Sequence, residues 1–271
     1  MQEGIRLLES AGDPDPAILC FDRALELRRR LPAEVPIHAY GLAACWLNRA
    51  EALTRLGPGF DTLTLHAYGE ALVLLRALPL GADARFSRRL AIALQNRALV
   101  LAAQNPPATA DAVAGLNEAI AVLDHAETMD APSRDYLLAA VWVNLANIER
   151  SETAARRAMA VVRFYEHDDA AAAEIGLKAR HILCQIAAHR LADQPQNEPM
   201  MAHVHDATDL VDEGLDLAGE WEERGVERFR TLASDLRRFG ARVYAQYQPQ
   251  FLQEFLSEQS PERQERATPQ F

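Results

Sequence analysis

The stretch LAACWLNRAEAL at residues 42–53 decides the fold, because closely related stretches recur at a fixed spacing. They are LAIALQNRALVL at 90–101 and LAAVWVNLANIE at 138–149, each 48 residues after the one before. Five columns stay in strict register, starting at Leu42, Ala43, Trp46, Asn48 and Ala50. A fixed period of this length is the signature of a repeat protein, so we expect the chain to stack copies of one supersecondary unit.

The spacing inside each stretch predicts a helix. One helical stripe takes residues at i, i+4, i+8 and i+11, which here are Leu42, Trp46, Ala50 and Leu53. Because a small side chain in such a stripe lets two helix axes approach closely, we expect the recurring alanine to lie at a tight helix–helix contact. Trp46 and Trp142 occupy the column of large residues, and we interpret them as part of the core.

A second series of related stretches alternates with the first, as in YGEALVLLRAL at 68–78 and LNEAIAVLDHA at 116–126. Its aligned alanines are Ala24, Ala71, Ala119, Ala158 and Ala207. Clusters that end helices, such as Gly57-Pro58-Gly59 and Asn105-Pro106-Pro107, lie between the two series. Each unit is therefore predicted to be a helical hairpin. One hairpin cannot bury both of its faces, so the hairpins are expected to stack.

We therefore expect an all-α fold, an αα-hairpin solenoid of about five hairpins plus a terminal helix, forming one domain over residues 1–250. The expected units are 1–31, 36–78, 83–128, 133–166 and 169–223, followed by a last helix at 225–246. The helices expected within the units are 2–11, 14–31, 36–56, 60–78, 83–104, 108–128, 133–150, 152–166, 169–193 and 199–223. The polar stretch at 257–271 contains two prolines and predicts a disordered tail.

These residues resemble the tetratricopeptide repeat family. The first helix of that repeat carries a large residue, a small one four positions on, and another large one, as in Trp46, Ala50 and Leu53. Ala158 lies 14 residues after Asn144, which fits the family's unit of about 34 residues, whereas most units here span 48 residues. The resemblance covers about residues 14–223. It implies a right-handed superhelix whose concave face is lined by the first helix of each hairpin.

The resemblance places a ladder of polar side chains on that concave face. The candidate partner-binding residues are Asn48, Asn96 and Asn144, together with the neighbouring Arg49, Arg97, Glu51 and Asn147. A side-chain amide both donates and accepts, so the ladder could hold the backbone of an extended peptide, and the arginines could hold a carboxylate. The alternative is that the asparagines bond to neighbouring helices and that the arginines pair with Glu51 or another acid.

Composition narrows the class of partner. The formal net charge of −11 disfavours nucleic acid and anionic membranes. We find no signal peptide and no apolar run that approaches the roughly 20 residues of a membrane span. The three cysteines, Cys20, Cys45 and Cys184, stand alone among apolar residues, which favours buried thiols in a reducing compartment. We therefore expect a cytoplasmic protein.

The histidines do not form a convincing metal site. His203 and His205 stand at i, i+2 on a predicted helix, so their rings point apart, and His181 and His189 lie two turns from each other. The sequence His167-Asp168-Asp169 resembles a metal phosphohydrolase dipeptide, but at a helix joint an aspartate is better interpreted as an N-cap. No nucleophile elbow or phosphate-binding loop occurs. We expect no enzyme activity, no metal and no cofactor.

Charge is sorted along the C-terminal part of the chain. Residues 209–223 carry seven acids and no basic residue, whereas six arginines lie between 224 and 242. We favour two neighbouring antiparallel helices of complementary charge. The alternative is an acidic stripe that meets a basic partner.

The leading functional hypothesis is a non-catalytic scaffold that binds a peptide or helix of another protein in its concave groove. One alternative is a sensor that encloses a short peptide or small ligand. The other is a self-assembling repeat that forms a homodimer through a solenoid end.

Overall fold

The computed structural model describes residues 1–10, 14–32, 34–193 and 198–258, and every regular element within these ranges is a helix. The predicted all-α class is confirmed for this part of the chain. The chain divides into two compact units, Met1–Ile148 and Glu149–Phe271, called here the first and the second unit.

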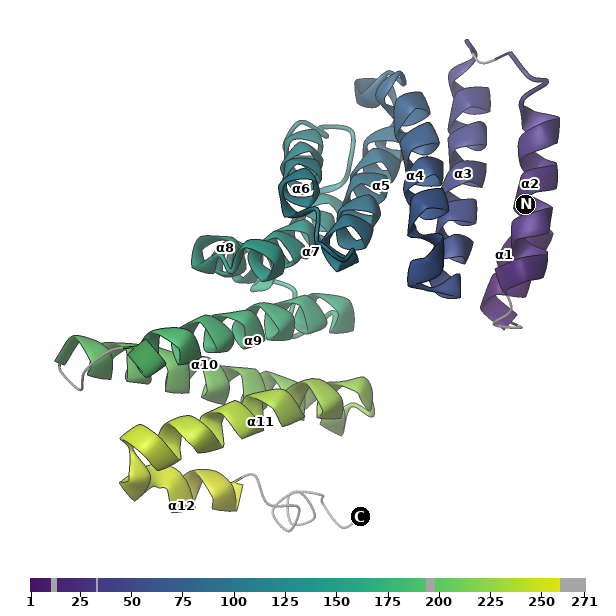
Figure 1. Cartoon of the computed structure of the whole chain (residues 1–271). Helices are drawn as coiled ribbons and strands as arrows, with labels where there is room; N and C mark the ends of the chain where they lie inside the picture. The colour runs from purple at the N-terminus through teal and green to yellow at the C-terminus, as the bar shows by residue number, and fades with distance from the viewer. Residues whose placement is uncertain (11–13, 33, 194–197, 259–271) are drawn as a thin grey trace, which may run out of the picture. The chain divides into compact units, whose positions relative to one another are not determined.

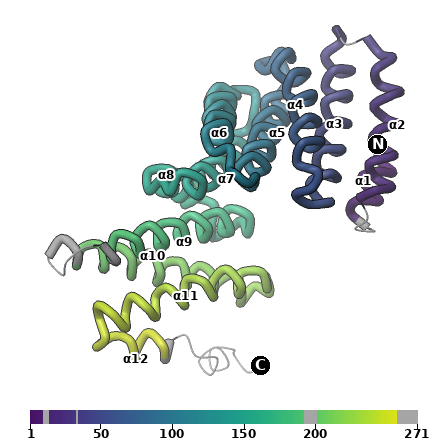
Figure 2. Tube along the Cα trace, viewed as in Figure 1, coloured from purple at the N-terminus to yellow at the C-terminus, as the bar shows by residue number. Residues whose placement is uncertain are grey.

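In the first unit, helices that are neighbours in the chain pack together over residues 2–124. Its elements are α1 (Gln2–Ser10), α2 (Pro14–Arg28), α3 (Pro36–Leu56), η1 (Pro58–Phe60), α4 (Asp61–Arg76), η2 (Leu80–Ala82), α5 (Ala84–Ala103), α6 (Thr109–Asp124) and α7 (Ala131–Glu149), whose last residue marks the unit boundary. Figures 1 and 2 show α2, α3 and α4 side by side, each antiparallel to the next. The bounds of α3 are those predicted, whereas α2 and α6 end earlier than expected, at Arg28 and Asp124.

The second unit follows the same pattern. Its elements are α8 (Glu152–Val162), α9 (Ala170–Asp193), α10 (Glu198–Glu223), α11 (Arg228–Tyr247) and α12 (Pro249–Glu258). Helices α9, α10 and α11 run antiparallel in turn, as Figure 1 shows, and α11 also contacts α9 and α12. The sequence did not predict α12. Residues 257–258 of the expected disordered tail belong to this helix, and residues 259–271 lie outside the described part of the chain.

Local sequence signals fix several helix ends. Pro36 stands in the first turn of α3, where its missing N–H costs no hydrogen bond. Gly57 follows α3 with φ of 99°, a conformation that glycine adopts without strain. Asp169 caps α9, because its Oδ1 accepts hydrogen bonds from the backbone N–H groups of Ala171 and Ala172 at 2.7 and 3.0 Å. The predicted N-cap at this joint is confirmed.

The alanines of the two repeated series lie in the interior of the fold. All of them are buried: Ala24, Ala50, Ala71, Ala98, Ala119, Ala146, Ala158 and Ala207. Gly115 of α6 shows how closely α5 and α6 approach, since a methyl group at that position would lie 3.9 Å from the Cβ of Ala98 and 3.7 Å from the carbonyl oxygen of Leu94. Because Ala98 is buried, a larger side chain there would have to displace its neighbours.

Trp46 lies in the core, as predicted. Only 7% of its surface is exposed, and its ring meets that of His66 edge-on at 5.8 Å. The guanidinium groups of Arg29 and Arg49 lie 5.2 and 5.8 Å from the indole centroid, within the range of cation–π contacts.

The second unit contains a buried ion pair that sequence reasoning missed. Arg180 of α9 donates two hydrogen bonds to the carboxylate of Glu166, at 2.9 and 3.1 Å, and both side chains are nearly inaccessible to solvent. The indole of Trp221 donates to the Glu166 carbonyl oxygen at 2.8 Å. Gly176 makes room for the pair, because a methyl group there would lie 2.5 Å from Glu166 Oε2.

The expected charge complementarity between α10 and α11 occurs at Glu222. Its carboxylate lies 3.6 Å from Arg230 and 3.4 Å from Arg237, and both arginines belong to α11. Arg228, at the start of α11, instead pairs with Glu174 of α9 at 3.2 Å. These three arginines of α11 therefore divide their ion pairs between α10 and α9.

Two glycines within helices of the second unit have opposite surroundings. A methyl group on Gly240 of α11 would lie 2.7 Å from the Phe255 ring and 2.8 Å from Val211. One on Gly219 of α10 would meet nothing within 4 Å. Gly240 therefore lies where side chains of α10 and α12 pack closely against the backbone of α11.

Among the described residues, no helix is both long enough and apolar enough to cross a membrane.

Candidate functional site

A pocket of about 540 Å³ lies in the first unit between α3, the start of α4 and α5. Its lining defines what we call the α3–α5 pocket: Glu51, Thr54, Arg55, Gly57, Pro58, Asp61, Tyr68, Asn96, Leu99, Val100 and Ala103. Glu51 and Asn96 are two of the partner-binding residues expected from the sequence. They come from helices that carry successive copies of the repeated stretch, so the repeat itself brings them to one site.

One wall of the pocket is apolar. Tyr68 of α4 is buried, Val100 of α5 is buried beside it, and Leu99 is 41% exposed. Burial raises the pKa of the Tyr68 hydroxyl to about 12, although interactions with the side chains of Thr54 and Asn96 oppose this rise. The hydroxyl is therefore neutral near pH 7, and it links the apolar wall to the Asn96 amide.

The polar rim has an excess of carboxylate. The guanidinium of Arg55 donates to Glu51 Oε1 at 2.8 Å and to the carbonyl oxygen of Leu8 at 2.7 Å, so it is already engaged. Asp61, in the first turn of α4, has no ion-pair partner in the described part of the chain. A cation that entered the pocket would therefore meet the carboxylates of Glu51 and Asp61, and an Arg55 side chain that is already hydrogen-bonded.

The other candidates from the sequence do not line this pocket. Asn48, Arg97 and Asn144 are half-buried, and Asn147 is exposed. Arg49 pairs with an acid, which was the alternative expected from the sequence: its Nε donates to Asp22 at 2.6 Å. The structure thus brings Glu51 and Asn96 together, whereas the full ladder of asparagines does not share one cavity.

Sequence reasoning missed Tyr68, Asp61 and Leu99. Tyr68 opens a stretch of the second alanine series, which was interpreted only as a packing helix. The cluster Gly57-Pro58-Gly59 was interpreted as a helix breaker, yet Gly57 and Pro58 also line the pocket. The available signal was an aromatic residue, Tyr68, on the helix that follows the Gly57-Pro58-Gly59 turn and precedes the helix of Asn96.

The histidine and aspartate motif at 167–169 serves local structure. His167 Nδ1 lies 2.7 Å from Glu220 Oε2, and Asp169 caps α9. Within the described ranges, no group of three or more histidine, cysteine, aspartate or glutamate side chains is placed to hold a metal ion.

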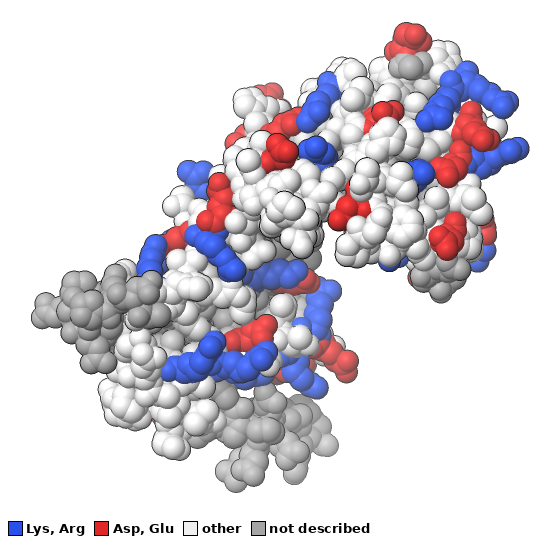
Figure 3. Space-filling model, in the orientation of Figure 1, with Lys and Arg blue, Asp and Glu red and all other residues white. Residues whose placement is uncertain are grey.

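Charges of both signs are interspersed on the surface. On the face seen in Figure 3, arginines and acids occur side by side on each of the two units. Many of them form ion pairs within a helix, such as Arg55 with Glu51 and Lys178 with Glu174.

The sequence matches no protein-family model and no curated protein.

Proposed function

We propose that the chain is an αα-hairpin solenoid similar to tetratricopeptide repeats, and that it acts as a non-catalytic scaffold binding a segment of another protein. Two kinds of contact support the solenoid. Consecutive helices pack together from α1 to α6 in the first unit and from α8 to α12 in the second, and further contacts skip one helix, from α3 to α5 and from α9 to α11. A stack of hairpins makes both kinds of contact.

The α3–α5 pocket is the observation that carries the proposal. It combines an apolar wall with a polar rim on two repeated helices. Leu99 on its lining and Phe60, which directly precedes Asp61, are large apolar residues with 41% and 38% of their surface exposed. Exposed apolar surface rimmed by polar groups is typical of a protein-binding site.

The lining favours one class of peptide. An apolar side chain would rest against Tyr68 and Leu99, where burial supplies most of the binding energy. The Asn96 amide can donate to and accept from the peptide backbone. A lysine or arginine of the peptide would meet Glu51 and Asp61. We therefore propose an extended segment in which an apolar residue neighbours a basic one.

Selection of linear peptides from a random display library against the full chain tests this proposal. The selected peptides are expected to share the apolar–basic pattern. Calorimetry should then show that Asn96→Ala weakens binding about tenfold, because the hydrogen bonds of a desolvated amide are lost. Glu51→Gln should weaken binding and reduce its dependence on salt.

Asn48→Ala is the matched control, since Asn48 occupies the same repeat column as Asn96 but lies outside the pocket. It should leave the affinity unchanged. Leu99→Asp should abolish binding while the circular dichroism spectrum stays the same. Peptides that bind both Asn96→Ala and Leu99→Asp as tightly as the parent chain would place the interaction elsewhere. Equal losses in Asn48→Ala and Asn96→Ala would favour the ladder over the pocket.

A further inference from the structure

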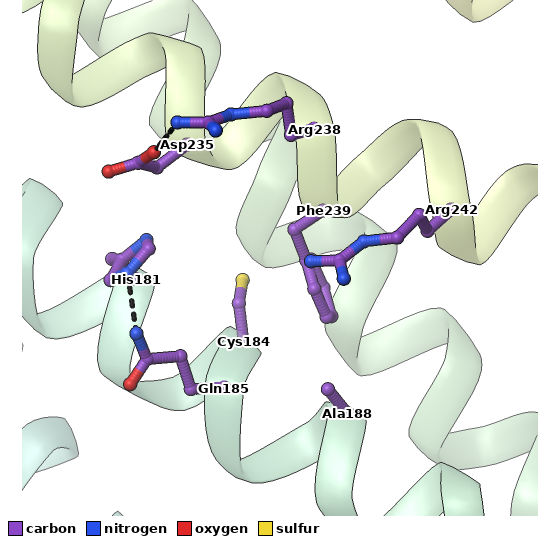
Figure 4. A pocket seen from close by; sticks show the side chains of 8 residues that line it. All are labelled: His181, Cys184, Gln185, Ala188, Asp235, Arg238, Phe239 and Arg242. Atoms are coloured by element: carbon purple, nitrogen blue, oxygen red, sulfur yellow. Dashed lines mark hydrogen bonds and ion pairs between the residues drawn. The ribbon is translucent and has the colours of Figure 1, made fainter.

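A second cavity lies entirely within the second unit, between α9 and α11, and has a volume of about 590 Å³. We call it the α9–α11 pocket. Its lining consists of His181, Cys184, Gln185 and Ala188 from α9, and Asp235, Arg238, Phe239 and Arg242 from α11. Figure 4 shows the side chains of the two helices projecting toward one another across it. This volume lies within the range of roughly 300–1,000 Å³ that is usual for small-molecule sites.

The inner surface of the pocket is apolar and unreactive. Cys184 and Phe239 are buried, and Ala188 stands one turn after Cys184 on α9. Burial raises the pKa of the Cys184 thiol to about 12, so the thiolate that nucleophilic chemistry requires does not form near neutral pH. This surface therefore suits the apolar body of a ligand that is bound but not transformed.

Hydrogen bonds fix the proton on His181. Gln185 Oε1 accepts from Arg150 at 2.5 Å, so the amide nitrogen of Gln185 faces His181 Nε2 at 2.7 Å. An amide nitrogen only donates, which makes Nε2 the acceptor and places the ring proton on Nδ1. Burial lowers the pKa of His181, which favours this neutral form. Within the described residues, Nδ1 has no hydrogen-bond partner and remains a donor.

The opposite wall is cationic. Arg238 and Arg242 stand one turn apart on α11. Among the described residues of the lining, the one carboxylate is that of Asp235, which is bonded to Arg238. Arg242 is exposed and has no ion-pair partner in the described part of the chain. The lining is thus positive in a chain whose formal net charge is −11. A free guanidinium beside apolar surface is suited to a planar carboxylate.

A smaller cavity of about 210 Å³ adjoins the α9–α11 pocket, and both are lined by Ala188, Phe239 and Arg242. It continues along the two helices past Leu191 and Val243. Arg242 therefore lies where an acidic head group could be held while an apolar chain or ring extends toward either side.

We propose that the α9–α11 pocket binds a small organic monocarboxylate with an apolar body, such as an aryl-acetic or medium-chain acid. Arg242 holds the carboxylate, with Arg238 and the His181 Nδ1–H as further donors. Phe239, Ala188 and Cys184 cover the apolar part. Inorganic phosphate fits less well, because Asp235 repels a dianion and only Arg242 is free to neutralise it. This site is separate from the α3–α5 pocket and does not depend on the function proposed for it.

The test uses the full chain and five probes: phenylacetate, octanoate, the neutral alcohol counterpart of each, and inorganic phosphate. Thermal-shift measurements and calorimetry are expected to show binding of at least one carboxylate, with its alcohol counterpart bound at least about tenfold more weakly. Arg242→Gln should weaken carboxylate binding about tenfold or more, because the free cation is lost.

Two further variants make the test specific. Ala188→Leu should fill the pocket and abolish binding while the helical circular dichroism signal is retained. Arg230→Gln is the matched control, because Arg230 lies on the same helix, is exposed and does not line the pocket. The proposal is overturned if neither carboxylate binds at millimolar concentration, or if phosphate binds as tightly as the carboxylates. It is also overturned if Arg230→Gln weakens binding as much as Arg242→Gln.

Discussion

Replacing Glu166 by glutamine tests how the second unit is held together. The substitution keeps the size of the side chain but removes the charge that neutralises Arg180. The two groups are joined by hydrogen bonds of 2.9 and 3.1 Å, and their side chains are only 5% and 7% exposed. After the substitution, the one carboxylate left within ion-pair distance of the buried guanidinium, among the described residues, is that of Glu213 at 3.5 Å, and its side chain is largely exposed.

The magnitude follows from this geometry. Two unit charges at about 3 Å attract by roughly 5.5 kcal/mol at an effective dielectric constant of about 20. The residual attraction to Glu213 and local entry of water offset part of that loss. We therefore expect Glu166→Gln to lower the free energy of unfolding by about 3–5 kcal/mol, which is the cost of breaking a buried pair by removing one partner.

The double variant Glu166→Leu with Arg180→Met should behave differently. It removes both charges, and it also removes Arg180 Nε, a buried donor with no hydrogen-bond partner in the described part of the chain. We expect its stability to lie within about 1 kcal/mol of the parent chain, because apolar side chains of similar volume often replace a buried pair without loss.

Urea unfolding measured by tryptophan fluorescence gives the stabilities, and hydrogen exchange of peptides from α9 and α10 localises the change to the second unit. Lys178→Gln is the control, since it breaks an exposed pair with Glu174 on the same helix and should cost less than about 0.5 kcal/mol. A loss below about 1 kcal/mol for Glu166→Gln would refute the reasoning. So would a double variant as unstable as its two single substitutions combined.

Three further predictions concern substitution or labelling at individual positions. Because the pKa of Tyr68 is raised from 10.0 to about 12, the folded state holds its proton more tightly than the unfolded state. Stability should therefore be intact below pH 10 and fall by up to about 3 kcal/mol as the pH rises toward 12; Tyr68→Phe should remove this part of the loss in urea titrations at several pH values. Gly240→Ala should lower the free energy of unfolding by about 1–3 kcal/mol through overpacking, whereas Gly219→Ala in open space should raise it by up to about 1 kcal/mol; equal effects in thermal melts would contradict the packing at Gly240. Iodoacetamide should label the half-buried Cys20 well before the buried Cys184 in the folded chain, and mass spectrometry that finds both labelled at the same rate would disprove the burial of Cys184.

Helices were predictable because their signals are local. Periodicity and breakers placed α3 at its observed bounds. The joint between two helices predicted an N-cap at Asp168 or Asp169, and the structure shows that Asp169 is the cap. The C-terminal helix α12 was missed because Pro249 stands at its start and the polar residues after 256 suggested that order had already ended. Phe251, Leu252 and Phe255 were the signal for an amphipathic helix there.

The candidate site was predictable only in part. The repeat put Glu51 and Asn96 in equivalent helices, and the structure places both on the α3–α5 pocket. Arg49, which the sequence offered as a partner-binding residue, is paired with Asp22 of α2. Which arginine is engaged and which is free depends on neighbours far away in the chain, and periodicity carries no information about them.

The sequence by itself determined the all-α class, the alternation of helix and turn, and the burial of the alanine columns, because hydrophobic spacing and helix caps act over one or two turns. Only the tertiary structure decided that Glu166 and Arg180 neutralise each other in the interior. It alone also assembled His181 of α9 and Arg242 of α11 around one cavity. The physical reason is that desolvation and ion pairing depend on distances between side chains from different helices, and those distances are set when the helices pack.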